Sequence, residues 1–148
     1  MLINNYKKKN IQGAAIELRL GSLYKQDKGT VDILEGKWPD AKEILIEEKP
    51  YTLKPGEFIL GKTIESFDVP DDLAALVVPR STIFRMGIES STGFVDPGYQ
   101  GELVVPMKNV GENPILLKHG MAVVKVIFLE VKGGTIPLFT RYMGGKVV

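Results

Sequence analysis

Short apolar runs, some of them alternating with polar positions, recur along the chain and predict β-strands. From Ile16 to Leu20 apolar and polar residues alternate, which is typical of a half-buried strand, and Gly21 is expected to end it. Further strands are predicted at 31–34, 43–47, 58–64, 73–78, 103–107, 115–117 and 121–129. Turns rich in Gly and Pro separate these ranges, so the pattern predicts an all-β protein folded as a compact sandwich or barrel.

One segment departs from the strand pattern. Ile83, Phe84 and Met86 fall within a short span that ends at Gly87, which predicts one or two helical turns. Ser81 or Thr82 is the expected cap of this helix, and the glycine is the expected terminator.

Composition narrows the class of protein. At 148 residues and 44% hydrophobic content, the chain has enough apolar mass for one domain with a real core. A net charge of +1, from 19 basic and 18 acidic residues, provides no strong field for nucleic acid or an anionic membrane, and we expect neither as a partner. No apolar run reaches the roughly 20 residues of a membrane span, so a cytoplasmic location is expected. We predict a β domain over residues 1–132 and a mobile or lid-like tail over residues 133–148.

The side chains available for metal binding are few. The chain has no cysteine and one histidine, His119, which excludes disulfides and a zinc site of the ordinary kind. Any metal would therefore be a hard cation held by oxygen atoms, together with substrate phosphates. The histidine lies in a Lys-His-Gly turn, where we expect exposure rather than catalysis.

Arg80, Ser81, Thr82 and Arg85 form the best candidate anion site. A helix N-terminus offers unpaired backbone N–H groups, and hydroxyls and guanidinium groups beside it suit a phosphate. Ser81 and Arg85 are four residues apart and would share a helix face. The alternative is an ordinary helix cap beside a surface salt bridge.

The stretch 93–103 predicts a tight hairpin that turns at Asp96-Pro97-Gly98. Its plainest interpretation is a surface turn. Asp96, however, follows the apolar Phe94 and Val95, where partial desolvation suits a general base that takes a proton from water.

Glu17 is a second candidate carboxylate because it is central in its strand, between Ile16 and Leu18. It would serve chemistry if it pointed inward. The alternative is an outward-facing partner for a lysine.

Several of these stretches, in order over residues 11–130, resemble the dUTPase and dCTP deaminase superfamily. Residues 12–21 resemble the deaminase motif Q-P-A-S-x-D-L-R-L-G, residues 53–58 resemble L-x-P-G-E-F, and residues 69–75 resemble L-P-D-D-L-A-A. Residues 80–87 are similar to the phosphate-binding motif R-S-S-L-A-R-L-G, and residues 93–103 to the nucleoside-binding hairpin of both branches. Residues 118–121 resemble the P-G-M turn, and residues 141–146 loosely resemble the deaminase tail K-Y-x-G-x-R.

The resemblance implies a dUTPase-like β-clip fold, which is a compact distorted barrel or jelly roll with one short helix. It also implies a homotrimer whose subunits share their active sites, with dUTP as substrate and Mg²⁺ bridging its phosphates. The implied roles are triphosphate binding by Arg80, Ser81, Thr82 and Arg85, pyrimidine binding by Gly93, Phe94 and Val95, stacking on the deoxyribose by Tyr99, and deprotonation of the attacking water by Asp96.

One position separates the two branches of the superfamily. The deaminase reaction uses a glutamate ten residues after the hairpin aspartate, and that position here is Pro106, which has neither a carboxylate nor an N–H. The resemblance therefore favours a dUTP diphosphatase that hydrolyses dUTP to dUMP and diphosphate, with Asp96 activating water for attack on the α-phosphate. The alternatives are a dCTP deaminase, alone or bifunctional, which Pro106 disfavours, and a non-catalytic nucleotide-sensing trimer.

The sequence departs from the family pattern at three further places. Glu17 replaces the usual aspartate and is predicted to reach the metal through water. Lys125 stands where dUTPases often carry glutamine and is predicted to serve the α-phosphate. The tail lacks the closing motif R-G-x-x-G-F-G-S, and Tyr142 and Lys146 are the predicted substitutes in a lid.

Overall fold

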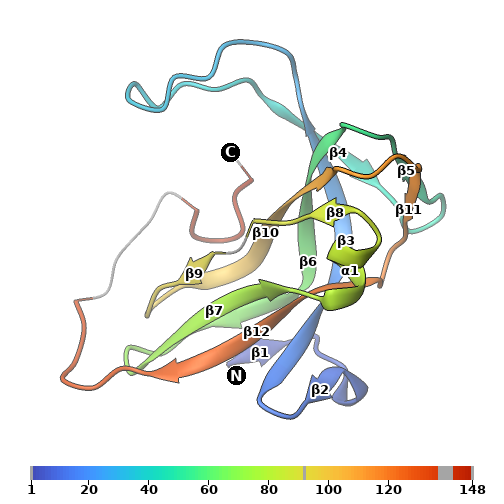
Figure 1. Cartoon of the computed structure of the whole chain (residues 1–148). Coiled ribbons are helices and arrows are strands. Elements are labelled where there is room, and N and C mark those ends of the chain that lie inside the picture. Colours follow the sequence, from blue (N-terminus) through green and yellow to red (C-terminus); the bar gives the residue numbers. More distant parts are fainter. Residues whose placement is uncertain (1, 92, 137–141, 148) are drawn as a thin grey trace.

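The computed structural model describes residues 2–91, 93–136 and 142–147, and Figure 1 shows a curled arrangement of strands with one short α-helix. The strands are β1 Ile3–Asn4, β2 Ile11–Gln12, β3 Ala15–Gln26, β4 Ala41–Leu45, β5 Tyr51–Leu53, β6 Phe58–Asp68, β7 Leu73–Pro79, β8 Ile88–Glu89, β9 Phe94–Val95, β10 Gln100–Asn109, β11 Ile115–Leu117 and β12 Ala122–Glu130. A 3₁₀ turn spans Lys8–Asn10, and helix α1 spans Ser81–Arg85. The predicted fold class, nearly all β with one short helix, is confirmed.

One strongly curled sheet carries most of the strands. Its order is β8–β10–β6–β3–β12–β7–β9, with β1 attached at β6 and with β2 and β4 attached at β3, while β11 and β5 form a separate pair. Burial alternates residue by residue along most of β6, as expected for a strand with one face in the core. The core includes Leu18, Leu23, Ile59, Met107 and Val124, each at most 1% exposed.

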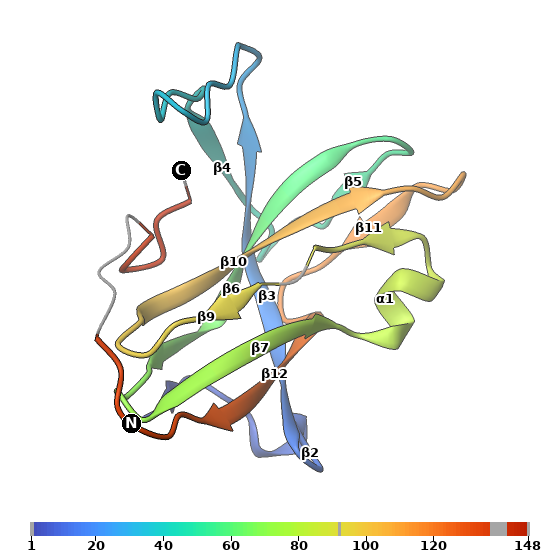
Figure 2. The same cartoon turned by 60° about the vertical axis from the view of Figure 1, so that its left-hand side comes forward.

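Strand β3 connects two groups of strands because its halves pair with different neighbours. Its first half pairs with β12, and its second half pairs with β6 and β4. Figure 2 shows β3 running between these groups. The β3–β6 ladder shifts register between Leu20 and Ser22, and a Cβ on the intervening Gly21 would lie 3.3 Å from the Ile64 Cγ1 atom. Gly21 therefore sits at a shift within a continuous strand, and the prediction that it ends the strand is wrong.

A buried ion pair joins β3 to β6. The Arg19 Nε atom lies 2.7 Å from the Glu65 Oε1 atom, and these side chains are 8% and 0% exposed. The backbone N–H of Arg19 donates to the other carboxylate oxygen of Glu65 at 2.7 Å, and the guanidinium also donates to the Asn5 carbonyl. Because each charge is hydrogen-bonded and paired, the two groups are compatible with burial.

The strand predicted at 31–34 is wrong. Residues 33–36 form a turn between Asp32 and Lys37, which exchange two backbone hydrogen bonds of 2.7 and 2.9 Å. Gly36 supplies the positive φ of +65° that this reversal uses. Ile33 and Leu34 are 84% and 96% exposed, so their apolar character does not reflect a place in the core. The next predicted strand, at 43–47, is found two residues earlier as β4.

The helix is found where it was expected, but its cap differs. Arg80 is the N-cap residue and makes no side-chain capping bond, whereas Ser81 and Thr82 are already inside α1. The prediction that one of these hydroxyls caps the helix is therefore wrong. Gly87 is confirmed as the terminator, because its φ is +93° and its N–H donates to the Phe84 carbonyl.

We predict that Glu65→Gln lowers the free energy of unfolding by about 3 kcal/mol, because the substitution leaves the Arg19 guanidinium buried without its counter-charge. Urea denaturation at a fixed protein concentration measures this loss. Glu35→Gln is the matched control, since its ion pair with Lys37 is exposed and such pairs contribute about 1 kcal/mol or less. Equal losses in the two variants would contradict the role assigned to the buried pair.

Candidate functional site

The residues of the predicted hairpin lie on two strands that do not pair with each other. Strand β9 pairs with β7, with Val95 opposite Ala75 and Phe94 opposite Leu76. Strand β10 pairs with β6 along its length and with β8 only at its end. The prediction of a tight two-stranded hairpin is thus wrong, because the chain crosses from one part of the sheet to the other at this turn. The two strands stand on either side of a gap.

The turn between β9 and β10 is held at both ends by backbone hydrogen bonds. The N–H of Tyr99 donates to the Asp96 carbonyl at 3.2 Å, and Gly98 has a φ of +82°. Val69 accepts from the N–H of Gly98 and donates to the carbonyl of Tyr99, each at 2.9 Å. The predicted Asp-Pro-Gly turn is therefore confirmed, and its attachment to a second loop fixes where Asp96 stands.

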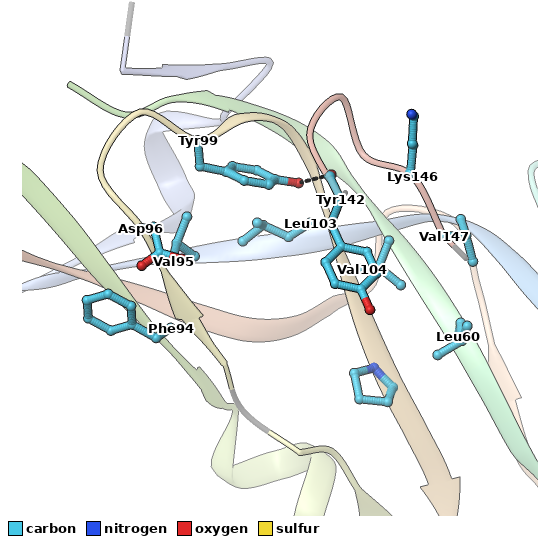
Figure 3. Close-up of a pocket in the computed structure, with 11 residues that line it drawn as sticks. Leu60, Phe94, Val95, Asp96, Tyr99, Leu103, Val104, Tyr142, Lys146 and Val147 are labelled. Atoms are coloured by element: carbon cyan, nitrogen blue, oxygen red, sulfur yellow. Dashed lines mark hydrogen bonds between the residues drawn. The ribbon is translucent and has the colours of Figure 1, made fainter. Parts of the chain in front are cut away.

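A cavity of about 420 Å³ occupies the gap (Figure 3). Its apolar lining residues are Leu60, Phe94, Val95, Leu103, Val104, Pro106 and Val147, and its polar lining residues are Asp96, Tyr99, Tyr142 and Lys146. An adjoining cavity of about 300 Å³ shares several of these residues and also reaches Gly93. Both volumes suit a small ligand, and a mainly apolar wall with a few polar groups is typical of such sites.

Pro106 is accommodated in β10 because the strand has a ladder partner on one side only at this position. Leu60 of β6 is opposite Pro106, whereas the β8 pairing begins at Lys108. Proline is tolerated in strands where its nitrogen faces away from a ladder. The cavity wall at residue 106 consequently offers no N–H and no carboxylate.

The Tyr99 side chain lies along one edge of the cavity, between the turn and the tail (Figure 3). Its hydroxyl donates to the Glu102 carbonyl at 2.5 Å and lies 3.5 Å from the Tyr142 carbonyl. Burial and the negative charge of Glu102 raise the pKa of Tyr99 to about 12. The phenol is therefore neutral near pH 7 and can present its ring face and its hydroxyl to a ligand.

The described part of the tail, residues 142–147, lies against the start of β10. The Gly144 N–H donates to the Gln100 carbonyl at 2.7 Å. A Cβ on Gly101 would come within 2.5 Å of the Gly145 nitrogen, and a Cβ on Gly145 would come within 2.5 Å of a Glu102 carboxylate oxygen. Because the atoms that a Cβ on Gly101 would meet are backbone, this close approach requires glycine at 101, while the φ of +71° favours glycine at 145. The contact places Tyr142 and Lys146 at the cavity. Arg141 lies outside the described residues.

The candidate phosphate residues gather elsewhere, where β3, β12 and β7 meet α1. The Arg80 Nε atom donates to the Glu17 Oε1 atom at 2.7 Å, and its Nη1 atom donates to the Ala122 carbonyl at 3.2 Å. Lys125 is opposite both Glu17 and Val78 in the ladders, so its side chain shares a sheet face with Glu17. Glu17 is 5% exposed and its partner is an arginine, so the alternative of an outward-facing partner for a lysine is wrong.

The other members of this group are accessible on α1. Ser81, Thr82 and Arg85 are exposed. His119 is also exposed, as expected, with its Nδ1 atom 3.0 Å from the Gly21 carbonyl oxygen. In the described ranges no group of three or more His, Asp or Glu side chains is arranged to hold a metal ion. No helix there is both long and apolar enough to cross a membrane.

The cavity and the phosphate-type residues are at opposite ends of β7 within one chain. Val95 is opposite Ala75, whereas Arg80 is five residues further along the strand direction. At a rise of 3.3 Å per residue this separation is roughly 16 Å. One chain therefore brings Asp96, Tyr99, Tyr142 and Lys146 together, and it brings Arg80, Glu17 and Lys125 together, but it does not join the two sets.

Sequence analysis missed some residues that line the cavity and some that contact the group around Arg80. Leu60 lines the cavity because the β6–β10 register places it opposite Pro106, and no local pattern signals that pairing. Asn10 donates to the Glu17 Oε2 atom at 3.5 Å and is 6% exposed. Its position at the end of a polar 3₁₀ turn carries no sequence signal for this contact.

Comparisons with known proteins identify relatives over nearly the whole chain. A family model described as dCTP deaminase-like matches residues 1–131. A protein of Dictyoglomus turgidum named "dCTP deaminase, dUMP-forming" is 37% identical over 142 residues, which cover 90% of this chain and 72% of that relative. A protein of the same name from Methanosphaera stadtmanae is 34% identical over 129 residues, covering 81% of this chain and 66% of the relative.

Solved structures share the fold. The 2′-deoxycytidine 5′-triphosphate deaminase of Agrobacterium tumefaciens superposes with a TM-score of 0.70 at 19% identity, covering 86% of this chain and less than half, 42%, of that chain. A mutant dUTPase from phage phi11 of S. aureus, described with a structural Mg(II) ion, gives a TM-score of 0.60 at 13% identity, covering 93% of this chain and 88% of the other.

The expected main activity, dUTP diphosphatase, is wrong on these comparisons. Curated relatives at 31–37% identity are named dCTP deaminase, dUMP-forming, which fits the alternative that Pro106 disfavours. Agreement over about nine-tenths of the chain outweighs an argument from one substituted position.

The family itself follows from the extent of the matches. The family model covers residues 1–131 of the 148, and the relatives above exceed 30% identity. The resemblance to the dUTPase and dCTP deaminase superfamily is confirmed, and the chain belongs to the dCTP deaminase-like family.

Proposed function

We propose that the protein converts dCTP to dUMP, with ammonia and diphosphate as the other products and two water molecules consumed. One water replaces the amino group at C4 of the pyrimidine, and the other cleaves the bond between the α- and β-phosphates. The observation that carries the proposal is the position of Asp96, a half-buried carboxylate on a tethered turn at the edge of a mainly apolar cavity.

The gap between β9 and β10 suits a pyrimidine ring. Each of these strands has an edge toward the gap that has no ladder partner there, so backbone groups of Phe94 are available to the ring edge, whereas the Gly93 carbonyl accepts from the Val77 N–H at 3.0 Å. Val95, which is 5% exposed, supplies an apolar contact to the ring. The neutral side chain of Tyr99 supplies a flat surface for the deoxyribose.

Asp96 is the one carboxylate among the described residues that line the cavity. A general base needs this position, within reach of a water held beside the substrate. Both hydrolyses depend on Asp96 in our proposal, because Pro106 supplies no proton donor or acceptor to the cavity wall.

Mg²⁺ fits this arrangement as a partner of the substrate. The ion takes one or two carboxylates plus substrate phosphates in sites of this kind, so the lack of an acidic cluster in the described residues is compatible with it. Because Asp96 serves as the base and Glu17 is hydrogen-bonded to Arg80, the substrate phosphates would supply most of the ligands of the ion. When bound, Mg²⁺ neutralises charge on the phosphates.

A homotrimer with shared sites would unite the two sets of residues. In this proposal the cavity of one copy receives the triphosphate-binding residues Arg80, Ser81, Thr82, Arg85 and Lys125 from a neighbour. Within one chain, Arg80 lies roughly 16 Å along β7 from Ala75, the partner of Val95, and this separation supports the arrangement. Phe84 on α1 and Met86 directly after it are 55% and 63% exposed, and association would bury these apolar side chains.

The tail acts as a lid in the same proposal. Residues 142–147 already lie over the start of β10, and Tyr142 and Lys146 line the cavity. A positive charge at Lys146 suits the anionic substrate. The boundary between a domain at 1–132 and a tail at 133–148 stays a prediction, as does the cytoplasmic location.

One observation favours a second candidate function. Pro106 replaces the glutamate that the family resemblance assigns to deamination, and it lines the cavity itself. A protein with this substitution would bind a pyrimidine nucleotide without releasing ammonia, as expected of a nucleotide-sensing trimer.

We predict that the purified protein with Mg²⁺ and dCTP releases ammonia and diphosphate and forms dUMP. Asp96→Asn should lower both releases by about 10²–10⁴-fold, because general-base assistance is lost while the shape of the side chain is kept. Asp71→Asn, which changes an exposed carboxylate outside the cavity, is the matched control and should retain the wild-type rate. A wild-type protein that binds dCTP and releases neither product would contradict the proposal.

A second prediction concerns the wall at residue 106. Pro106→Glu should release ammonia from dCTP about 10²-fold faster than Pro106→Ala, because it adds an acid–base group that the alanine control does not. Quantifying ammonia and the base of the product in parallel measures the difference. Equal rates in the two variants would show that this position does not limit deamination, and ammonia from Pro106→Glu alone would favour the second candidate function for the wild-type protein.

A further inference from the structure

The contact between Glu17 and Arg80 joins two segments that are 63 residues apart in the chain. Glu17 lies within β3, and Arg80 is the residue between β7 and α1. The Glu17 side chain is 6% exposed, whereas that of Arg80 is 28% exposed. The carboxylate is thus enclosed, and the guanidinium is the member of the pair that reaches the surface.

The backbone and the side chain of Arg80 are both held. Its N–H donates to the Val123 carbonyl at 3.2 Å, and its own carbonyl accepts from the N–H of Ile83 at 2.9 Å in the first turn of α1. Its Nε atom donates to Glu17 and its Nη1 atom donates to Ala122. The two backbone bonds fix the Cα position, and the two side-chain bonds leave the side chain little freedom to adopt another rotamer.

The contacts engage Nε and Nη1, which lie on opposite sides of the guanidinium group. The group has five N–H donors in a fixed plane, of which Nε–H and one on Nη1 are engaged with Glu17 and Ala122 within the described residues. The donors that remain suit an oxyanion, because a planar fork can bind phosphate oxygens in pairs. Lys125, opposite Glu17 in the ladder, adds a second positive charge on the same face of the sheet.

We infer that Glu17 is a positioning residue, which holds the Arg80 guanidinium in the orientation that receives the triphosphate of the substrate. The inference rests on the proposed function for the nature of the ligand. Asn10 supports the same geometry by donating to the second oxygen of Glu17. Pre-orientation of this kind strengthens binding because a flexible arginine would otherwise lose rotamer freedom when the ligand binds.

This role differs from that of a metal ligand. A carboxylate that reached Mg²⁺ through water would act only when the ion is present, whereas a carboxylate that orients Arg80 acts without metal. It also differs from a purely structural ion pair, whose removal would destabilise the fold without distinguishing one nucleotide from another.

The test measures binding of dCTP, dCMP and inorganic tripolyphosphate by calorimetry, in EDTA and again with Mg²⁺. Glu17→Gln should weaken the binding of dCTP and tripolyphosphate about tenfold, in line with one charge-assisted hydrogen bond that is lost or misdirected. Its binding of dCMP should stay within about twofold, because the monophosphate lacks the β- and γ-phosphates. Glu17→Asp keeps the charge but is one methylene shorter, so its dissociation constants should fall between those of the wild type and Glu17→Gln. Thermal unfolding of each variant checks that it is folded, and Glu17→Asp serves as the test if Glu17→Gln is not.

A double-mutant cycle isolates the route of the effect. If Glu17 acts through Arg80, then Glu17→Gln should weaken tripolyphosphate binding no further once Arg80→Ala is present. Additive losses in the double variant, a loss seen only with Mg²⁺, or unchanged dCTP and tripolyphosphate binding in Glu17→Gln would each overturn the inference. Failure of the proposed function is distinguishable from this, because tripolyphosphate reports on Arg80 whether or not the protein accepts or converts dCTP.

Discussion

The pairing of β9 with β7, rather than with β10, is the constraint on which the candidate site depends. Had Phe94 and Val95 formed a ladder with β10, backbone hydrogen bonds would have filled the space that the cavity now occupies. The pairing is stable because Val69 exchanges backbone hydrogen bonds with Gly98 and Tyr99 at the end of the turn and because Val95 is buried against the sheet. Strand edges with unpaired backbone N–H and C=O groups normally favour aggregation. Here they border a cavity in which a ligand would form hydrogen bonds with these groups.

A second constraint follows from the direction of β7. This strand carries the partner of Val95 near one end and leads into Arg80 at the other, so a single chain separates the cavity from the phosphate-type residues. Strand β3 makes the separation rigid, since its two halves belong to different ladders and the buried Arg19–Glu65 pair joins it to β6. Because this separation is rigid, association of several copies, rather than a conformational change within one chain, is the favoured way to complete a site.

The sequence predicted most of the strands and the turn at Asp96, but not which distant segments pair with one another. Strands with clear apolar runs, such as β7 and β12, and the turn at Asp96 were predictable because their signals are local. The strand expected at 31–34 failed because Ile33 and Leu34 are apolar yet exposed. The Glu17–Arg80 pair and the Leu60 side of the cavity depend on sheet register between distant segments, which alternation alone does not encode. The argument from Pro106 concerned one position, which was weaker evidence on activity than relatives that match most of the chain.

The central claim is that the cavity of one copy works with the Arg80 segment of another, and subunit mixing tests it most directly. Asp96→Asn and Arg80→Ala, each inactive alone, are unfolded together and refolded as an equal mixture. Random assembly of trimers with shared sites predicts recovery of about a quarter of the wild-type rate of diphosphate release from dCTP, because about that share of sites would unite an intact Asp96 with an intact Arg80. A mixture that stays as inactive as its two components would contradict the account.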